Sequence, residues 1–116
     1  MDENGVHHLP DVLSALNHPL RLNVIAALSQ ERKYVSELAR ELGISRPLLY
    51  MHLERLEKAG LVQGSLELSA EGKAIKWYSL KPFDIRINLE TVLAALAQTQ
   101  PPTSQGNAEM KGNPNE

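Results

Sequence analysis

A cluster of polar side chains suited to binding nucleic acid lies near the middle of the sequence. Arg46 can donate two hydrogen bonds to one guanine or grip a phosphate through its guanidinium. Ser45, Tyr50 and His52 add hydrogen-bonding groups close by, and Arg55 follows as a second guanidinium. Because these residue types recognise base edges and phosphates, the cluster predicts a DNA-contacting segment, with Arg46 as the first choice for reading a base.

Each of these side chains also has a structural alternative. Arg46 can be a surface arginine paired with a glutamate. His52 is equally well explained as a partly buried side chain that is satisfied within the protein. The ring of Tyr50 can contact a thymine methyl group or rest on the protein surface. Arg55 lies further along the segment and is expected to touch a phosphate or solvent rather than a base.

Catalytic and metal-binding chemistry finds little support in the sequence. The chain has no cysteine, which excludes disulfides, thiolate metal sites and thiol nucleophiles. It also offers no glycine-rich phosphate-binding loop and no paired nucleophile and base. His7, His8 and His18 lack the neighbouring ligands of a metal site. No enzyme activity, cofactor or metal is therefore expected.

Composition and charge indicate a small protein with one domain. The 116 residues include 42% apolar residues, enough for a modest core. The net charge is −2 and the pI about 6.1, so a nucleic-acid site must be local. No run approaches the roughly 18 apolar residues of a membrane span, and a cytoplasmic protein without membrane contact is expected. Residues 1–10 are expected to be a flexible N-terminus, residues 11–98 the folded domain, and residues 99–116 a disordered tail.

The polar cluster needs a scaffold, and the sequence predicts a pair of helices joined by a tight turn. Four apolar residues before the cluster recur at helical spacing: Val35, Leu38, Ala39 and Leu42. Gly43 can end this helix, Ser45 can cap the next one, and Pro47 suits its first turn. The second helix is expected over 46–59, with Leu49, Leu53 and Leu56 on its buried face. Such a short turn favours the crossing of a helix-turn-helix, which makes the second helix project from the body.

A β-hairpin is predicted directly after the second helix. Apolar and polar residues alternate from Val62 to Leu68, and a second β-prone segment runs from Ala74 to Leu80. Between them Gly72 can adopt a positive φ. Lys73 and Lys76 can reach phosphates that flank the bases. The alternative is a plain solvated hairpin.

Helices are also expected at both ends of the domain, over 11–17, 19–28 and 89–98, with Asn88 as a cap for the last one. A domain of this size contacts few base pairs, so a homodimer on a two-fold DNA site is expected. Small alanines on the last helix permit close helix approach. The expected interface residues are Leu13, Leu16, Leu89, Val92, Leu93 and Leu96. The alternative is that this apolar stripe closes the core of the monomer.

The helix pair and the hairpin together resemble the ArsR family of bacterial and archaeal regulators. The most specific match is residues 37–62, ELARELGISRPLLYMHLERLEKAGLV, and residues 15–28, ALNHPLRLNVIAAL, resemble an earlier family segment. The resemblance implies a mainly α fold with a small β-hairpin (α+β): a winged helix-turn-helix with a three-helix core, a wing and a C-terminal dimerisation helix. It also implies a transcriptional regulator, expected to be a repressor, that binds double-stranded DNA as a homodimer on a palindromic operator. The alternative is a winged-helix protein-interaction module without specific DNA binding.

The resemblance places Ser45, Tyr50 and His52 in the DNA-facing region, although the family often has a small hydroxyl residue in place of Tyr50. Contacts are expected from the second helix, 46–59, and from the wing, 62–80. The predicted DNA-binding residues are Ser45, Arg46, Pro47, Tyr50, His52, Arg55, Lys73 and Lys76.

The metal-sensing residues of many relatives are missing from this sequence. Two cysteines that many relatives have at the start of the helix preceding the turn correspond to Tyr34 and Ser36, neither of which is a thiolate. A second family site uses Asp and His on the last helix, but Asp84 and Arg86 are followed by no histidine. The resemblance therefore implies no metal sensing and leaves an effector of unidentified chemistry open. Tyr34 also stands where a capping Ser or Thr is common.

Overall fold

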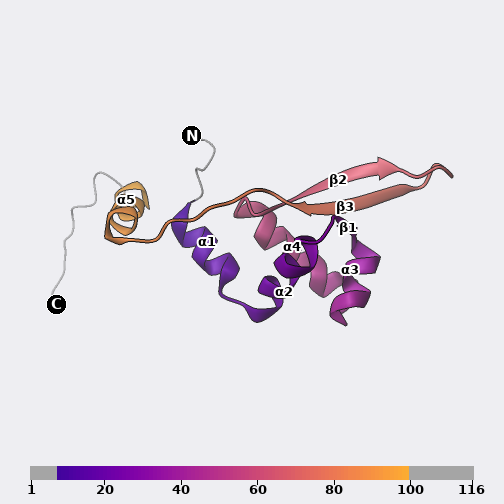
Figure 1. Cartoon of the computed structure of the whole chain (residues 1–116), viewed down its shortest axis with the longest axis horizontal. Helices are drawn as coiled ribbons and strands as arrows, with labels where there is room; N and C mark the ends of the chain where they lie inside the picture. The colour runs from indigo at the N-terminus through magenta and orange to yellow at the C-terminus, as the bar shows by residue number, and fades with distance from the viewer. Residues whose placement is uncertain (1–7, 100–116) are drawn as a thin grey trace. The chain divides into compact units, whose positions relative to one another are not determined.

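The computed structural model describes residues 8–99 of the chain (Figure 1). They divide into two compact units, one ending at Ile85 and the other beginning at Arg86. The elements run in the order α1 (Leu9–Leu16), α2 (Pro19–Leu28), β1 (Lys33–Tyr34), α3 (Val35–Leu42), α4 (Arg46–Lys58), β2 (Val62–Leu68), β3 (Ala74–Leu80) and α5 (Leu89–Thr99). The expected flexible N-terminus and disordered tail lie outside the described residues except at 8–10 and 99, where α1 begins and α5 ends.

The predicted helix-turn-helix is formed by α3 and α4, and its local signals act as expected. Gly43 ends α3 with a φ of 70°, in the left-handed region that glycine adopts at least cost. Ser45 precedes α4, and its hydroxyl accepts a hydrogen bond from the Leu48 N–H at 3.3 Å. Pro47 lies in the first turn, where a missing N–H leaves no helical bond unmade. The start of α4 is therefore fixed by its own sequence.

The hairpin is also confirmed, and it belongs to a sheet of three strands rather than two. The strand order is β1-β3-β2, with all pairs antiparallel. The two-residue β1 was not predicted, because a strand this short has no visible periodicity. It places Tyr34 opposite Trp77, and the two rings meet edge to face with centroids 5.3 Å apart. This contact explains why Tyr34, which makes no side-chain cap on α3, replaces a capping residue.

The core of the first unit lies among α1–α4 and the adjoining end of the sheet. Its fully buried side chains include Val12, Val24, Leu38, Leu49, Leu53, Leu56 and Leu61. The expected fold had a core of three helices. In the structure α1 also contributes to the core, through Val12 and Ala15. Figure 1 shows the β2–β3 hairpin extending past these helices. Leu66 and Leu68, in the extended part of β2, are 67% and 75% exposed.

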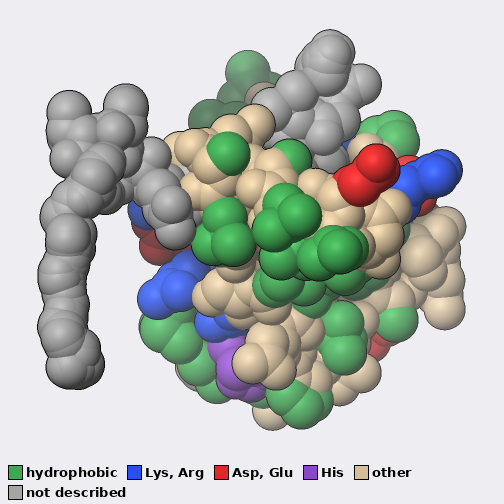
Figure 2. All heavy atoms as spheres, turned by 90° about the vertical axis from the view of Figure 1, so that its left-hand side faces the viewer, with side chains coloured by type: hydrophobic (Ala, Val, Ile, Leu, Met, Phe, Trp, Pro, Cys, Tyr) green, Lys and Arg blue, Asp and Glu red, His purple; other side chains and the backbone are tan. Residues whose placement is uncertain are grey.

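The second unit contains α5, whose start is fixed by a reciprocal cap. The Thr91 N–H donates to the Asn88 side-chain oxygen at 2.9 Å, and the Asn88 N–H donates to the Thr91 hydroxyl at 2.9 Å. The large apolar residues of α5 are exposed: Leu89, Val92, Leu93 and Leu96. Figure 2 shows hydrophobic side chains gathered on one face of the molecule. In the part of the chain that the structure describes, no helix is long and apolar enough to cross a membrane.

Candidate nucleic-acid interface

The N-terminal end of α4 presents a free guanidinium. Ser45, Arg46 and Pro47 are all exposed. Within residues 8–99 no ion pair or hydrogen bond engages the Arg46 side chain, so the alternative of a glutamate-paired arginine is not seen. Because the backbone N–H groups of a helix start also point outward, this end attracts anions. Arg46 is therefore available to bind a base edge or a phosphate.

The outward surface of α4 carries more apolar side chains than the sequence predicts. Tyr50 is 46% exposed, and Leu48 and Met51 are 38% and 49% exposed. Leu48 and Met51 were not predicted as candidates. The helical spacing of the sequence does indicate their exposure, because both residues fall outside the buried stripe of Leu49, Leu53 and Leu56. Such side chains suit contact with thymine methyl groups.

The expectation that His52 faces DNA is wrong. Its side chain is only 2% exposed, and its Nδ1 accepts a hydrogen bond from the Arg21 Nε–H at 3.0 Å. The His18 ring lies against it, with centroids 4.6 Å apart. Burial, helped by the positive charge of Arg21 and by His18, lowers the pKa of His52 below its ordinary value. His52 thus holds α4 onto α1 and α2, as its structural alternative proposed.

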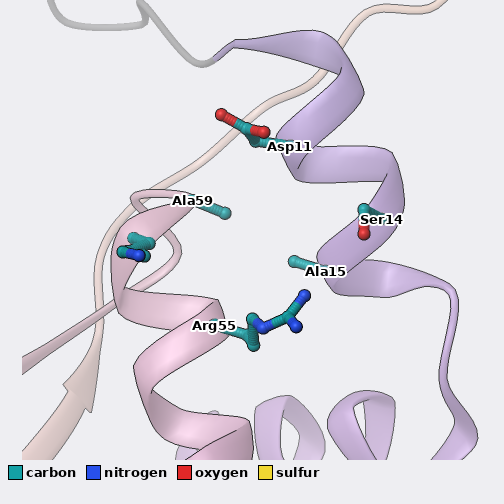
Figure 3. Close-up of a pocket in the computed structure, with 6 residues that line it drawn as sticks. Asp11, Ser14, Ala15, Arg55 and Ala59 are labelled. Atoms are coloured by element: carbon teal, nitrogen blue, oxygen red, sulfur yellow. The ribbon is translucent and has the colours of Figure 1, made fainter.

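Arg55 is not on the same side of α4 as Tyr50. Five residues separate them, which turns the side chain by about 140° around a helix. Figure 3 shows Arg55 directed at α1, next to Ser14 and Ala15, and these residues line a common cavity. The expectation that Arg55 binds a DNA phosphate beside Tyr50 is therefore not supported by this geometry.

The side chain of Lys76 lies on the face of the hairpin that is directed toward α4. Gly64 pairs with Tyr78, and Leu66 pairs with Lys76, so these side chains share one face of the sheet. A Cβ on Gly64 would lie 2.7 Å from Lys76 Cε, and the Lys76 ammonium lies 5.8 Å from the Tyr78 ring centre. Burial and the negative charge of Glu57, on α4, raise the pKa of Tyr78. Lys76 is thus presented on the α4 side of the wing.

On the opposite face of the hairpin, the charged side chains are paired within the protein. The Arg32 guanidinium lies 4.1 Å from the centre of the Trp77 ring and pairs with Glu67 at 2.6 Å. The hydrogen bond from Arg32 lowers the pKa of Glu67. This face therefore carries no spare positive charge, whereas Lys73 is exposed at the turn of the hairpin.

A metal centre is not visible in the structure between residues 8 and 99. No group of three or more His, Cys, Asp or Glu side chains gathers there in a way that could hold an ion. His8 contacts only Asp11, at 3.1 Å. His18 accepts a hydrogen bond from the Leu20 N–H at 3.2 Å, which caps α2. The described histidines thus have structural roles.

Known proteins share this combination of helix pair and wing. Residues 18–63 match the model of the bacterial regulatory proteins of the arsR family. An HTH-type transcriptional regulator of Methanocaldococcus jannaschii is 38% identical over 78 residues, which cover 67% of this chain and 81% of that protein. The chain belongs to the ArsR family. It is a transcriptional regulator with a winged helix-turn-helix DNA-binding fold, and not an enzyme.

Two further similar proteins bear on how the fold is used. The biofilm growth-associated repressor of Xylella fastidiosa is 31% identical over 61 residues, 53% of this chain and 54% of the repressor. A homodimeric winged helix-turn-helix DNA-binding domain from Mycobacterium bovis, solved by NMR, superposes with a TM-score of 0.58 at 25% identity. That likeness covers 78% of this chain and 75% of the other.

Proposed function

We propose that this ArsR-family protein is a repressor that binds a palindromic DNA operator as a homodimer. The observation that carries the proposal is the unpaired Arg46 guanidinium at the exposed, Ser45-capped start of α4. A helix fits the major groove of about 12 Å, and its N-terminal residues lie nearest to the base edges. Arg46 is thus positioned to read a guanine. The repressor role is supported by the names of relatives such as the Xylella protein.

The proposed contacts on DNA divide between α4 and the wing. Ser45, Arg46, Pro47 and Tyr50 lie at the start of α4 and would enter the major groove. Lys73 and Lys76 lie on the hairpin and would bind phosphates flanking that groove. Leu48 and Met51 join the α4 set because they are exposed beside it. His52 and Arg55 are left out, the first because it is buried and the second because it points at α1.

The homodimer supplies the second copy of this surface. We place the exposed residues of α5 at the interface together with Leu13 of α1, because apolar side chains that are this exposed are stabilised by burial against another chain. Leu16 of α1 is half-buried against the core and would add only its exposed part. A neighbour of the same fold that is homodimeric supports the formation of a dimer. Two recognition helices would then sit about 34 Å apart and read half-sites one turn of DNA apart.

The experiment is a DNA titration preceded by in-vitro selection of the bound sequence. Arg46→Ala should weaken binding to the selected duplex by at least about fivefold, because a bidentate contact to a base is worth roughly 1–3 kcal/mol. Lys81→Ala is the matched control, since it removes an exposed positive charge just after β3 rather than at the start of α4. Wild-type binding should weaken steeply with salt as counterions are released. Equal losses in both variants, or a salt-independent affinity, would count against the proposal.

The alternative of a protein-interaction module has one observation in its favour. Leu66 and Leu68 form an exposed apolar strip on the wing. The same selection experiment separates the two functions. A chain that recovers no sequence above random duplex, while folded and dimeric, would support the protein-interaction module.

A further inference from the structure

A cavity of about 480 Å³ lies between the first helix and the recognition helix. One wall is α1, and the other is the C-terminal part of α4 (Figure 3). Its lining residues are Asp11, Ser14 and Ala15 on α1, and Arg55, Lys58 and Ala59 on α4. The volume falls within the roughly 300–1,000 Å³ of small-molecule sites.

The charges in this cavity favour an anion. Arg55 and Lys58 supply two cations, and within residues 8–99 neither is paired with a carboxylate. Asp11 is the one acidic residue of the lining, and its carboxylate is already engaged by His8 at 3.1 Å. Ser14 adds a hydroxyl that can donate a hydrogen bond. Guanidinium and ammonium groups together with a hydroxyl are the donors that bind carboxylates and phosphates.

The cavity is placed apart from both surfaces already assigned to DNA and to the second subunit. Asp11 and Ser14 are three residues apart and share one flank of α1. Leu13 and Leu16 occupy the other flank, so a dimer formed through them leaves the cavity accessible. On α4, Arg55 faces away from Tyr50 by about 140°. The site can therefore be occupied while the start of α4 is in DNA.

We propose that this cavity is an effector site for a small anion that carries a carboxylate or a phosphate group. The α1 wall is tied to α4 by one side chain, because Arg21 donates to the Ser14 and Ala15 carbonyls at 3.2 and 3.5 Å and to His52 at 3.0 Å. A ligand held by Arg55 and Lys58 on α4 and by the Ser14 hydroxyl on α1 would connect the same pair of helices. Its binding would shift α4 relative to α1 and so change the affinity for DNA, a step that rests on the proposed function.

Binding is tested first on the full chain without DNA. The probes are inorganic phosphate and succinate, each titrated at constant ionic strength against chloride and followed through backbone amide NMR signals. Saturable shifts are expected for Ser14, Ala15 and Ala59. Whichever probe saturates at the lower concentration identifies the class of anion. Shifts that rise linearly with either probe, or that centre on Lys73 and Lys76 instead, would overturn the site.

Variants then decide whether the lining residues hold the anion. Arg55→Gln combined with Lys58→Gln should weaken binding at least about tenfold, because it removes both cations that hold the anion. Arg40→Gln removes an exposed charge on α3, which does not line the cavity, and should leave anion binding unchanged. Asp11→Asn should tighten binding severalfold, because it removes a carboxylate from beside the anion. Amide spectra confirm that each variant is folded, and an unchanged affinity in the folded double variant would refute the proposal.

Regulation is tested separately with the selected DNA duplex. The better probe should change the DNA affinity of the wild type and leave that of the double variant unchanged at equal ionic strength. Anion binding without any effect on DNA would refute the effector role. Normal DNA binding by a chain that binds neither anion would refute the site and leave the proposed function standing.

Discussion

Arg21 and His52 are joined by a 3.0 Å hydrogen bond although 31 positions separate them in the chain. The Arg21 Nε–H is the donor, so the His52 Nδ1 must carry a lone pair and the ring must be neutral with its proton on Nε2. A second proton would have to enter at Nδ1, directly against a guanidinium. The contact that fixes the recognition helix is therefore one that acid opposes.

Acid should destabilise the protein through His52. Its pKa is lowered in the folded state, mainly by burial, so the unfolded chain binds the proton more readily. The stabilisation is complete above about pH 6.5, the ordinary value for histidine, and is lost as the pH falls toward the lowered value of the folded protein. Thermal melts should show a lower Tm at pH 5.0 than at pH 7.5.

The control for this pH effect is another histidine. His52→Gln should remove most of the difference in Tm between the two pH values, whereas His8→Gln should preserve it because His8 is at the exposed start of α1. Arg21→Met should cost roughly 1–3 kcal/mol at pH 7.5, since it leaves the buried His52 nitrogen without its donor and removes the Arg21 hydrogen bonds to the Ser14 and Ala15 carbonyls. An equal pH effect in His52→Gln would assign the acid sensitivity to other groups.

A methyl group on Gly64 should weaken DNA binding without touching DNA. The added Cβ would lie 2.7 Å from Lys76 Cε and 3.0 Å from the Tyr78 ring, so the flexible lysine must move away. Gly64→Ala and Lys76→Ala should each weaken binding, and each should reduce the salt dependence by the equivalent of about one phosphate contact. The two changes together should do no more than Lys76→Ala alone. Full additivity in fluorescence anisotropy titrations would contradict this link.

The buried ammonium of Lys33 should make Glu41 important for stability. Lys33 is 5% exposed, and its ammonium lies 3.2 Å from Glu41 and 3.8 Å from Glu31. The hydrogen bond to Glu41 raises the pKa of Lys33, which means that the charged form is favoured. Glu41→Gln should lower Tm more than Lys33→Met, because only the first leaves a buried charge without its main partner. Equal Tm values for both variants would show that solvent screens this pair.

The sequence was sufficient where structure is set by neighbours in the chain. Gly43 and Ser45 mark the turn between α3 and α4 by their own conformation and capping, and the alternation from Val62 to Leu68 marks the first strand of the wing. The predicted boundaries of these elements therefore lie close to those in the structure. Arg46 was likewise recognisable as a candidate, because its position next to a cap predicts an exposed helix start.

Long-range contacts could not be predicted in this way. Periodicity places His52 beside the buried stripe of α4 but does not reveal Arg21, a partner on another helix. The same limit applies to Arg55, whose orientation toward α1 depends on how two helices pack. The strand at Lys33 and Tyr34 is defined only by its pairing with β3. Each of these features is fixed by tertiary structure, and each changes the assignment of the site.

The last prediction concerns the α5 surface. Leu93 is 54% exposed among other apolar residues of α5, and a charge there would have to be buried if this surface is the dimer interface. Leu93→Glu should convert the dimer to a monomer in sedimentation experiments and weaken operator binding strongly, since a monomer engages only one half-site. Gln98→Glu adds the same charge about 140° around the helix and should leave the dimer intact. A Leu93→Glu protein that remains dimeric would move the interface to another surface and leave the exposed stripe of α5 to a different partner.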